Sequence, residues 1–569
     1  MALRFYLARL KHASRKELLH RAREFFFNLR LSRQWHRGHL ALPVPEVREQ
    51  VLRGLQLPDM AGTRLPGSED GVVHGIDGGD RREDEGRFRG VPFSRVKTSM
   101  LSCDLRALWE PARLQQCVAA DAVDPACVFA WLEENPFPLG LHYMSVMECG
   151  LRIPVFVRCL KTAELGEERR RALAKAIFEH AWLIQNRLSL HSSLGNHTVA
   201  ECVGLVFAGG VFQESGEGRA WLEQGVDLLH QELFHQILPD GGPAEQSLSY
   251  HRFVLDLYWL AVDFLESNGF HDCAAWKSRL ESGENFLGAF MDARGVFPAI
   301  GDSDDGHAIA PGLAPRRHEP ELCTVGVTTF PESGYTVVRQ QSGVILTVDH
   351  GPLGMAPLFN HGHADALSFT LGLRGTAFFI DPGTYRYNGV PKERQYFKGT
   401  RSHNTVTVDG QDQARQLTSF IWDSPYEAGA SLHESVGLTE ISGWHDGYTR
   451  LASPVVHRRT FRVTEGRIEI LDSFLGRGIH DFDLHMHLHP DVQVVQQGMS
   501  LVLQRDGVAL DVRFETQGRL DFVRGQEEPF LGWYSPAYGL LEPTTTVRLS
   551  RTGLAADVRF KTIINLRAQ

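Results

Sequence analysis

The stretch FNHGHADALSFTLGLRGTAFFIDPGTYRYN, residues 359–388, decides how the rest of this chain is interpreted. Its centre is a run of apolar, aromatic and small residues closed by Asp-Pro-Gly, which is typical of a β-strand region ending in a turn. His361 and His363 precede the run and Asp381 ends it. Strands seldom begin and end with ionisable groups for folding alone, so the stretch also indicates a functional site.

The period-two pattern continues from about residue 330 to the end of the chain. Apolar or aromatic runs bounded by Gly, Asp or Pro recur in SGVILTVDHG, SHNTVTVDG, HRRTFRVTEGRIEILDSF and HDFDLHMHLHP. Because no long helical pattern interrupts them, this half of the chain predicts an antiparallel β-sandwich.

Before about residue 325 the apolar spacing is helical instead. In the segment 167–191 five aliphatic side chains recur on one helical face: Leu173, Ile177, Ala181, Ile184 and Leu188. Further helices of this kind, joined by short turns, predict stacked helical hairpins. The chain is therefore expected to form two domains, residues 1–325 and 326–569, which meet near the proline-rich segment APGLAPRRHEPELC.

Composition excludes several classes of protein. A chain of 569 residues exceeds one ordinary core, and a formal net charge of -10 lacks the basic excess of a nucleic-acid-binding protein. Apolar runs are too short for a transmembrane span. Residues 1–30 read as a basic amphipathic helix, which either packs on its own domain or touches an anionic membrane surface or a partner. Since a secretory signal is missing, the protein is expected in the cytoplasm, with the periplasm as the alternative.

Two further features have simple interpretations. The eight cysteines lie between Cys103 and Cys323 and form no CxxC pair, so buried free thiols are predicted. Residues 62–90 are rich in glycine and charge, which predicts a long irregular loop.

The sandwich half contains a candidate metal site. His361 and His363 are two residues apart and so share one side of an extended chain, while Asp381 and His403 lie at the ends of neighbouring predicted strands. Two imidazoles and a carboxylate can provide the three protein ligands of a Zn²⁺ site. A competing set lies along one strand face, where residues in a line enclose an ion less readily: His485, His487 and His489.

The helical half contributes three polar clusters, each with a structural alternative. Asn196 and His197 begin an apolar helix, where Asn196 could simply cap the helix. A second cluster opens another helix, where a surface-facing first turn is the alternative: Glu245, Gln246, Tyr250, His251 and Arg252. A third cluster either binds a cation or is a solvated turn: Asp302, Asp304 and Asp305.

These segments together resemble the heparinase II/III-like polysaccharide lyases, which are relatives of the alginate lyases. The matching pieces occur in family order and cover about residues 190 to 415: NHTVAE, DGGPAEQSLSYHRF, GDSDDG, NHGHADALSFTL, IDPGTYRYN and RSHNTVTVDGQDQ. The resemblance implies an incomplete (α/α) toroid followed by an antiparallel β-sandwich. It also implies cleavage of a uronic-acid polysaccharide by β-elimination.

Elimination sets three tasks, and the resemblance distributes them. The uronate carboxylate must be neutralised or hydrogen-bonded, a base must remove the C5 proton, and an acid must protonate the departing oxygen. Asn196 is similar to the amide that binds the carboxylate. Tyr250 matches the acid, which in some substrates is also the base. His361 is the second acid/base group, with His197 as a helper.

The resemblance also implies binding residues. Gln246 and Arg252 are candidate substrate contacts. His363, Asp381 and His403 match a structural Zn²⁺ site, and a substrate contact stays open for His403. The expected partner is an anionic polysaccharide or oligosaccharide, in particular a bacterial exopolysaccharide at the cell surface.

Two other functions stay open. One is a non-catalytic polysaccharide-binding or assembly factor of the same fold. The other is a glycoside hydrolase, which needs two carboxylates across a cleft, with three candidates: Glu201, Glu245 and Asp302. The sugar, the linkage and the oligomeric state are not determined at this level.

Overall fold

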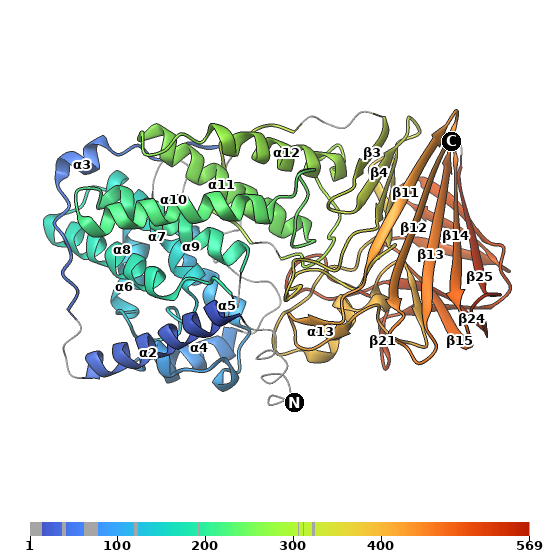
Figure 1. Ribbon diagram of the computed structural model, residues 1–569, viewed down its shortest axis with the longest axis horizontal. Helices are drawn as coiled ribbons and strands as arrows, with labels where there is room; N and C mark the ends of the chain where they lie inside the picture. Colours follow the sequence, from blue (N-terminus) through green and yellow to red (C-terminus); the bar gives the residue numbers. More distant parts are fainter. Residues whose placement is uncertain are drawn as a thin grey trace. The chain divides into compact units, whose positions relative to one another are not determined.

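The computed structural model describes residues 14–36, 41–61, 78–118, 123–191, 194–304, 306–310, 312–320 and 325–567 (Figure 1). The chain divides into two compact units, each assembled from three segments. Unit 1 is built from residues 1–236, 252–280 and 306–318, and unit 2 from residues 237–251, 281–305 and 319–569. A single boundary after residue 325 stays a prediction.

Unit 1 is helical. Its helices are α2 (Arg15–His36), α3 (Glu49–Gly54), α4 (Gly78–Phe88), α5 (Leu105–Trp109), α6 (Pro125–Glu134), α7 (Val146–Thr162), α8 (Glu167–Arg187), α9 (Asn196–Val211) and α10 (Gly216–Gln236), with most of α11 (Leu248–Ser267) and the start of α12 (Ala274–Phe290). All five side chains of the stripe predicted for α8 are buried. Helices α7 and α9 approach closely because glycines face each other: a Cβ on Gly204 would lie 2.7 Å from the Cα of Gly150.

In the described residues, the three largest antiparallel sheets of unit 2 have five, four and eight strands. The first has the order β3 (Gly326–Phe330), β4 (Tyr335–Arg339), β5 (Val344–Asp349), β6 (Phe369–Leu373), β7 (Thr376–Phe379). The second has the order β19 (Arg519–Arg524), β24 (Thr545–Leu554), β15 (Ile479–His487), β8 (Val406–Val408). The largest has the order β11 (Ala428–Ser435), β12 (Leu438–Tyr448), β13 (Val455–Thr464), β14 (Arg467–Gly476), β25 (Arg559–Leu566), β18 (Val508–Phe514), β17 (Ser500–Arg505), β16 (Gln493–Gln497).

The core of unit 2 lies between the inner faces of these sheets. Burial alternates along β13, where Phe461 and Val463 point inward and Arg462 points to solvent. Phe474 of the largest sheet and Phe482 of the four-stranded sheet pack with ring centroids 4.3 Å apart. The period of two predicted for this half is therefore the side-chain alternation of sheets that bury one face.

Two expectations about unit 1 are wrong. Residues 78–88 of the predicted irregular loop form α4, where Arg81 pairs with Glu85 and Asp84 accepts hydrogen bonds from the backbone of Ser102 and Cys103. Residues 62–77 of that segment lie outside the described residues.

The cysteines are the second correction, because they are not all free thiols. Cys117 and Cys127 form a disulfide across ten positions of sequence. The remaining described cysteines are free and buried: Cys103, Cys149, Cys159, Cys202 and Cys273. Cysteine spacing alone could not reveal the pair, because the bond requires Cys117 to lie beside Cys127 of α6 in the folded chain.

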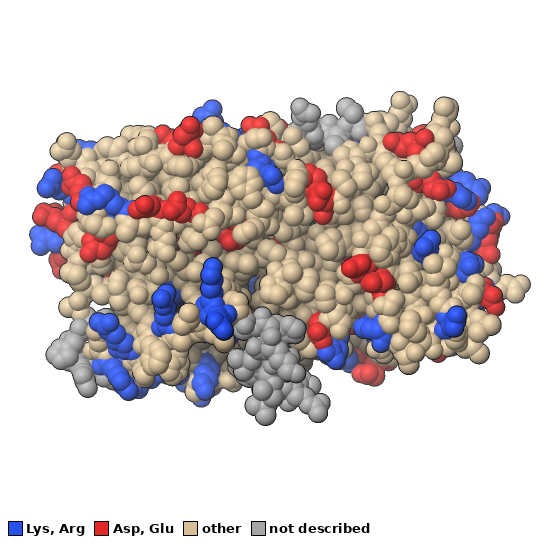
Figure 2. All heavy atoms as spheres, in the orientation of Figure 1, with Lys and Arg blue, Asp and Glu red and all other residues tan. Residues whose placement is uncertain are grey.

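The N-terminal segment is helical from Arg15 to His36, and its first thirteen residues lie outside the described part of the chain. On the face shown in Figure 2, Lys and Arg side chains gather where α2 and α4 lie, without Asp or Glu among them. None of the helices in the described residues is long and apolar enough to cross a membrane.

Candidate active site and metal site

The candidate site is built within unit 2 from loop segments that lie far apart in sequence. They are the first turn of α11 with the residues before it, the loop after α12, the loops that flank β6 and β7, and α13 (Pro391–Lys398). Gly301 makes one close approach possible. Its φ is +69°, and a Cβ there would meet the carbonyl oxygen of Gln246 at 2.2 Å. Because glycine has no Cβ, the chain can pass this close to Gln246, and the next residue, Asp302, lies in the site.

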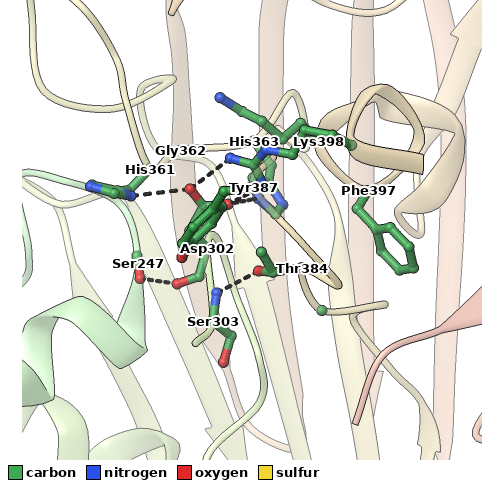
Figure 3. A network of polar contacts seen from close by, with 12 residues as sticks. Ser247, Asp302, Ser303, His361, Gly362, His363, Thr384, Tyr387, Phe397 and Lys398 are labelled. Carbon is green, nitrogen blue, oxygen red and sulfur yellow. Dashed lines mark hydrogen bonds and ion pairs between the residues drawn. The ribbon is translucent and has the colours of Figure 1, made fainter. Parts of the chain in front are cut away.

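Asp302 is the centre of a buried polar network (Figure 3). Its Oδ2 accepts a hydrogen bond from Nδ1 of His361 at 3.0 Å, and its Oδ1 accepts one from Nε2 of His363 at 3.0 Å. The guanidinium of Arg394 donates to both oxygens, at 2.6 and 2.8 Å. The carboxylate is fully buried, so it is neutralised by protein groups rather than by water.

The charge state of Asp302 determines the tautomers of its neighbours. Burial alone would raise the pKa of Asp302, but Arg394 and the hydrogen bonds from the two imidazoles outweigh it and hold the pKa well below its usual range. An ionised carboxylate can only accept hydrogen bonds. His361 therefore carries its proton on Nδ1, which leaves the lone pair on Nε2, and His363 carries its proton on Nε2.

Tyr250 lies against His361, and their rings stack with centroids 3.9 Å apart. The phenol of Tyr250 donates to Oδ2 of Asp304 at 2.9 Å, and that of Tyr387 donates to the same oxygen at 3.2 Å. Tyr387 also lies under the guanidinium of Arg394, 5.0 Å from the ring centroid. A phenol and an imidazole are thus held face to face, each by its own carboxylate.

A set of three metal-ligand residues lies beside this network. One ligand atom from each of His363, Asp381 and His403 fits within 4.8 Å of the others, and all three residues are buried. Nδ1 of His363 and Nε2 of His403 have no hydrogen-bond partner. Asp381 accepts from Nδ1 of His403 at 3.0 Å. Burial lowers the pKa of His363 to about 4, so this imidazole is neutral at neutral pH.

The arrangement fits a divalent metal ion. Buried polar atoms in folded proteins almost always have partners, so two orphaned imidazole nitrogens facing a carboxylate are the pattern expected of a metal-ligand set. Asp302 would act as the outer carboxylate that orients His363, as is usual for metal-bound histidine. The competing strand differs, because both ring nitrogens of His487 are hydrogen-bonded, to Arg401 and Thr546.

Comparison with known proteins now identifies the family. The model described as "Heparinase II/III N-terminus" matches residues 131–310. The model described as "Heparinase II/III-like, C-terminal" matches residues 324–565. The chain belongs to the heparinase II/III-like family.

Curated relatives of this family member are named heparin-sulfate lyases. The protein from Bacteroides stercoris is 24% identical over 394 residues, which cover 62% of this chain and 54% of the relative. The protein from Pedobacter heparinus is 23% identical over 391 residues, covering 60% and 55%. The chain thus spans about half the length of the curated relatives it matches.

Solved structures confirm the predicted fold class. The crystal structure of a heparinase III matches with a TM-score of 0.65 at 15% identity, over 95% of this chain and 91% of that one. A chondroitin AC lyase from Streptomyces coelicolor matches with a TM-score of 0.50 at 12% identity, over 95% and 83%. This family member therefore has an N-terminal (α/α) toroid followed by a C-terminal antiparallel β-sandwich.

The structure places the predicted site residues in both units. Tyr250, His361, His363, Asp381 and His403 come together in unit 2, as described above. Gln246 is buried there, and its amide nitrogen donates to the carbonyl oxygens of Ser333 and Pro243, at 3.0 and 3.3 Å. These two hydrogen bonds fix Gln246 to the backbone beneath the site.

The other predicted residues belong to unit 1. Asn196 is the first residue of α9 and is buried, while Gly195 occupies the capping position, so Asn196 is not the helix cap. His197 follows on the same helix. Arg252 lies 3.7 Å from Asp256 one turn further along α11. The convergence of these three residues with Tyr250 and His361 stays a prediction.

Sequence reasoning missed several residues of the site. Asp302 does not sit in a solvated turn, because it is fully buried and ion-paired. Arg394 and Tyr387 were not singled out, although a charged residue inside a short helix next to a Tyr-rich turn was a visible signal. Asp304 belonged to a predicted cluster, but its contacts with the phenols of Tyr250 and Tyr387 depend on loops that are distant in sequence.

Proposed function

We propose that this protein is a polysaccharide lyase that cleaves a uronate-containing polysaccharide by β-elimination. The observation that carries the proposal is the stacked pair of Tyr250 and His361, in which each side chain is held by a separate carboxylate. Relatives named heparin-sulfate lyases support the same reaction class. A binding protein would not need an imidazole and a phenol in this arrangement.

The chemistry assigns one proton transfer to each side chain. His361 has its lone pair on Nε2 and removes the C5 proton of the uronate. Tyr250 gives its phenolic proton to the departing glycosidic oxygen, which suits a group whose ordinary pKa is about 10. Asp304 accepts hydrogen bonds from Tyr250 and Tyr387 and so orients the phenol. Asp302 keeps His361 in the required tautomer.

Unit 1 supplies the remaining roles in the proposal. Asn196 binds the uronate carboxylate, where a hydrogen bond stabilises the enolate-like charge that develops as the proton leaves. His197 assists it. Arg252 contacts the substrate, because a guanidinium can hold a carboxylate or sulfate in bidentate fashion.

A zinc ion completes the proposal. His363, Asp381 and His403 would hold it, since two of their buried nitrogens are otherwise orphaned. The ion would supply charge neutralisation for Asp381 and a cross-link between the loops that flank β6, β7 and β8. We assign His403 to the metal rather than to the substrate because its side chain is fully buried.

The proposed substrate is an anionic polysaccharide or oligosaccharide, in particular an exopolysaccharide of the bacterial surface. Between the two expected compartments, the cytoplasm and the periplasm, the Cys117–Cys127 disulfide favours the periplasm. Disulfides persist in oxidising compartments and are rare in the cytosol.

Hydrolysis is the weaker alternative because two of its three candidate carboxylates are committed elsewhere. Asp302 is locked by Arg394. Glu201 is fully buried and accepts hydrogen bonds from the backbone and hydroxyl of Ser189, at 2.8 and 2.7 Å. Neither carboxylate is placed to flank a glycosidic bond.

The test is to incubate the protein with alginate, heparan sulfate and chondroitin sulfate and to follow the ultraviolet absorbance of the unsaturated product. Rising absorbance is expected with at least one polymer. Reducing ends without absorbance would mean hydrolysis, and retained binding without either product would mean a binding factor. Each of these two outcomes overturns the proposal.

Tyr250→Phe is expected to lower the rate of product formation by at least about a thousandfold, because the acid is lost while the ring stack is kept. Its melting temperature should stay near that of the wild type, since Tyr387 still donates to Asp304. Tyr396→Phe is the matched control, as this buried phenol lies in a separate aromatic cluster with Phe530. Full activity of Tyr250→Phe would remove Tyr250 from the mechanism.

A further inference from the structure

Helix α2 turns an unusual face to solvent. Five of its large apolar side chains are between 37 and 65% exposed: Leu18, Leu19, Phe25, Phe26 and Leu29. Elsewhere in the described residues, exposed large apolar side chains are spread over many elements, and Ile479 and Leu554 form a pair on neighbouring strands. Single exposed apolar residues are normal, but five within three turns of one helix form a patch that calls for a partner.

The same face is strongly basic. Five cationic side chains of α2 are exposed and make no ion pair or hydrogen bond with any other described residue: Arg15, Lys16, Arg23, Arg30 and Arg33. The acidic residues of the helix are instead engaged, Glu17 with Arg21 and Glu24 with Arg187. Figure 2 shows Lys and Arg gathering over this region of the surface. The outward face is therefore apolar and cationic without acidic residues.

Packing within unit 1 holds this face outward. On the opposite side of α2, the ring of Phe27 lies 5.2 Å from that of Trp182 on α8, and Leu31 is buried. Ser32 accepts a hydrogen bond from Arg95 at 3.0 Å. Near the start of the helix, the ring of His20 lies 5.3 Å from that of His191. Because these contacts engage one side of the helix between His20 and Ser32, the Phe and Leu patch cannot rotate inward without breaking them.

Charge and hydrophobicity together select the partner. A second copy of this chain would bring five further cations against the first five, which is unfavourable. A polyanionic saccharide would neutralise the cations but would leave Phe25, Phe26 and the leucines in water. An anionic phospholipid surface satisfies both, because headgroup charges meet the cations and the apolar side chains enter the acyl boundary.

We propose that the outward face of α2 binds an anionic phospholipid membrane surface. The helix would lie in the plane of the interface, with its Phe and Leu side chains below the phosphates and its Arg and Lys side chains among them. Each cation near such a surface adds to the affinity, so five of them make binding both strong and dependent on salt. The surface would hold the lyase next to the membrane from which surface polysaccharides are assembled.

The experiment is co-sedimentation of the full chain with vesicles of phosphatidylcholine alone or with roughly a quarter phosphatidylglycerol. Binding to the anionic vesicles is expected to be at least about tenfold tighter and to fall as salt is added. Phe25→Ser/Phe26→Ser and Arg23→Gln/Arg30→Gln should each weaken it by roughly tenfold or more. These positions are exposed, so the variants should fold and keep the lyase activity.

Matched controls remove equivalent groups elsewhere. Val436→Ser/Ile479→Ser deletes two exposed apolar side chains of unit 2, and Arg316→Gln/Arg458→Gln deletes two exposed cations. Neither pair should change vesicle binding. Absence of binding to anionic vesicles overturns the proposal. So does retention on immobilised heparin that depends on Arg23 and Arg30 but not on the phenylalanines. A dimer that Phe25→Ser/Phe26→Ser dissociates, without vesicle binding, would identify self-association instead.

Discussion

At the level of single residues, Asp302 links the two parts of the candidate site. One carboxylate oxygen holds His361, the proposed base, and the other holds His363, a proposed metal ligand. Arg394 donates to both oxygens and is itself buried. A buried ion pair of this kind is often retained for geometry rather than for net stability. Here the geometry is the tautomer and the orientation of two imidazoles.

Asp302→Asn is expected to lower the free energy of unfolding by about 3–5 kcal/mol, because Arg394 is left buried without a counter-charge. Equilibrium unfolding in denaturant measures this change in free energy. The double variant Asp302→Asn/Arg394→Met should recover part of the loss. As a control, Glu528→Gln breaks the exposed pair with Lys392 and should leave the free energy of unfolding nearly unchanged. An Asp302→Asn protein as stable as the wild type would contradict the assigned ion pair.

The lowered pKa of Asp302 also predicts how the stability of the protein changes with pH. The pKa of Asp302 is lowered in the folded state, so its stabilisation is fully present above its unfolded pKa of about 4 and is lost as pH falls below that value.

Glu201 should have the opposite pH dependence. Burial raises the pKa of Glu201 to about 8, despite its hydrogen bonds with Ser189. Its contribution to stability is therefore present below its unfolded pKa of about 4.3 and is lost as pH rises through about 8. Glu201→Gln mimics the protonated form, so its melting temperature should fall less than that of the wild type as pH rises from about 4.3 to about 8. If the melting temperatures of the two proteins changed with pH in parallel, the raised pKa of Glu201 would be contradicted.

At the level of elements, the metal-ligand residues lie where three chain segments meet. His363 precedes β6, Asp381 follows β7, and His403 precedes β8. Asn404 reinforces the same junction, because its amide donates to the carbonyl oxygens of Phe369 and Ile380. The junction is thus arranged by ordinary hydrogen bonds, and a metal ion would tighten a site that the strands already form.

Purified protein is expected to contain roughly one zinc ion per chain, as a single three-ligand site would hold. His363→Ala should lower both the metal content and the melting temperature, and a chelator should lower the melting temperature of the wild type but not of the variant. His433→Ala, an exposed histidine on β11, is the control. Metal analysis that finds no ion, together with an unchanged melting temperature for His363→Ala, would exclude the ligand assignment.

At the level of the whole molecule, the two units depend on different cross-links. Unit 1 contains the Cys117–Cys127 disulfide, and unit 2 contains the candidate metal site. A disulfide that closes a loop of about ten residues stabilises by about 3 kcal/mol in the chain-entropy description. Redox conditions and metal supply should therefore act on separate parts of the chain.

Hydrogen exchange can test this separation. Reductant is expected to speed amide exchange around residues 115–134, and a chelator around residues 361–366 and 400–408, with little effect of either on the other region. Cys117→Ser/Cys127→Ser should respond to the chelator and not to reductant. A chelator that alters exchange in α6 rather than beside β6 and β8 would contradict the placement of the metal.

The sequence by itself determined the class of fold and the family, and it predicted the candidate metal-ligand residues. A helix or strand that buries one face needs apolar residues at the period of that element, and this period can be recognised within a short stretch of sequence. The segments HGH, DPG and SHN each lie at the end of a strand pattern, which pointed to one edge of a sheet and to four candidate ligands. The family resemblance narrowed these to His363, Asp381 and His403.

Tertiary structure alone decided the remaining contacts. Asp302 and Arg394 are 92 positions apart, and Tyr250 and Tyr387 are 137 apart, so nothing in either local segment marks them as partners. The Cys117–Cys127 bond and the helix α4 depend likewise on what folds against them. The physical reason is that a buried charge or phenol is defined by the groups that replace its water, and those groups are selected when distant segments meet.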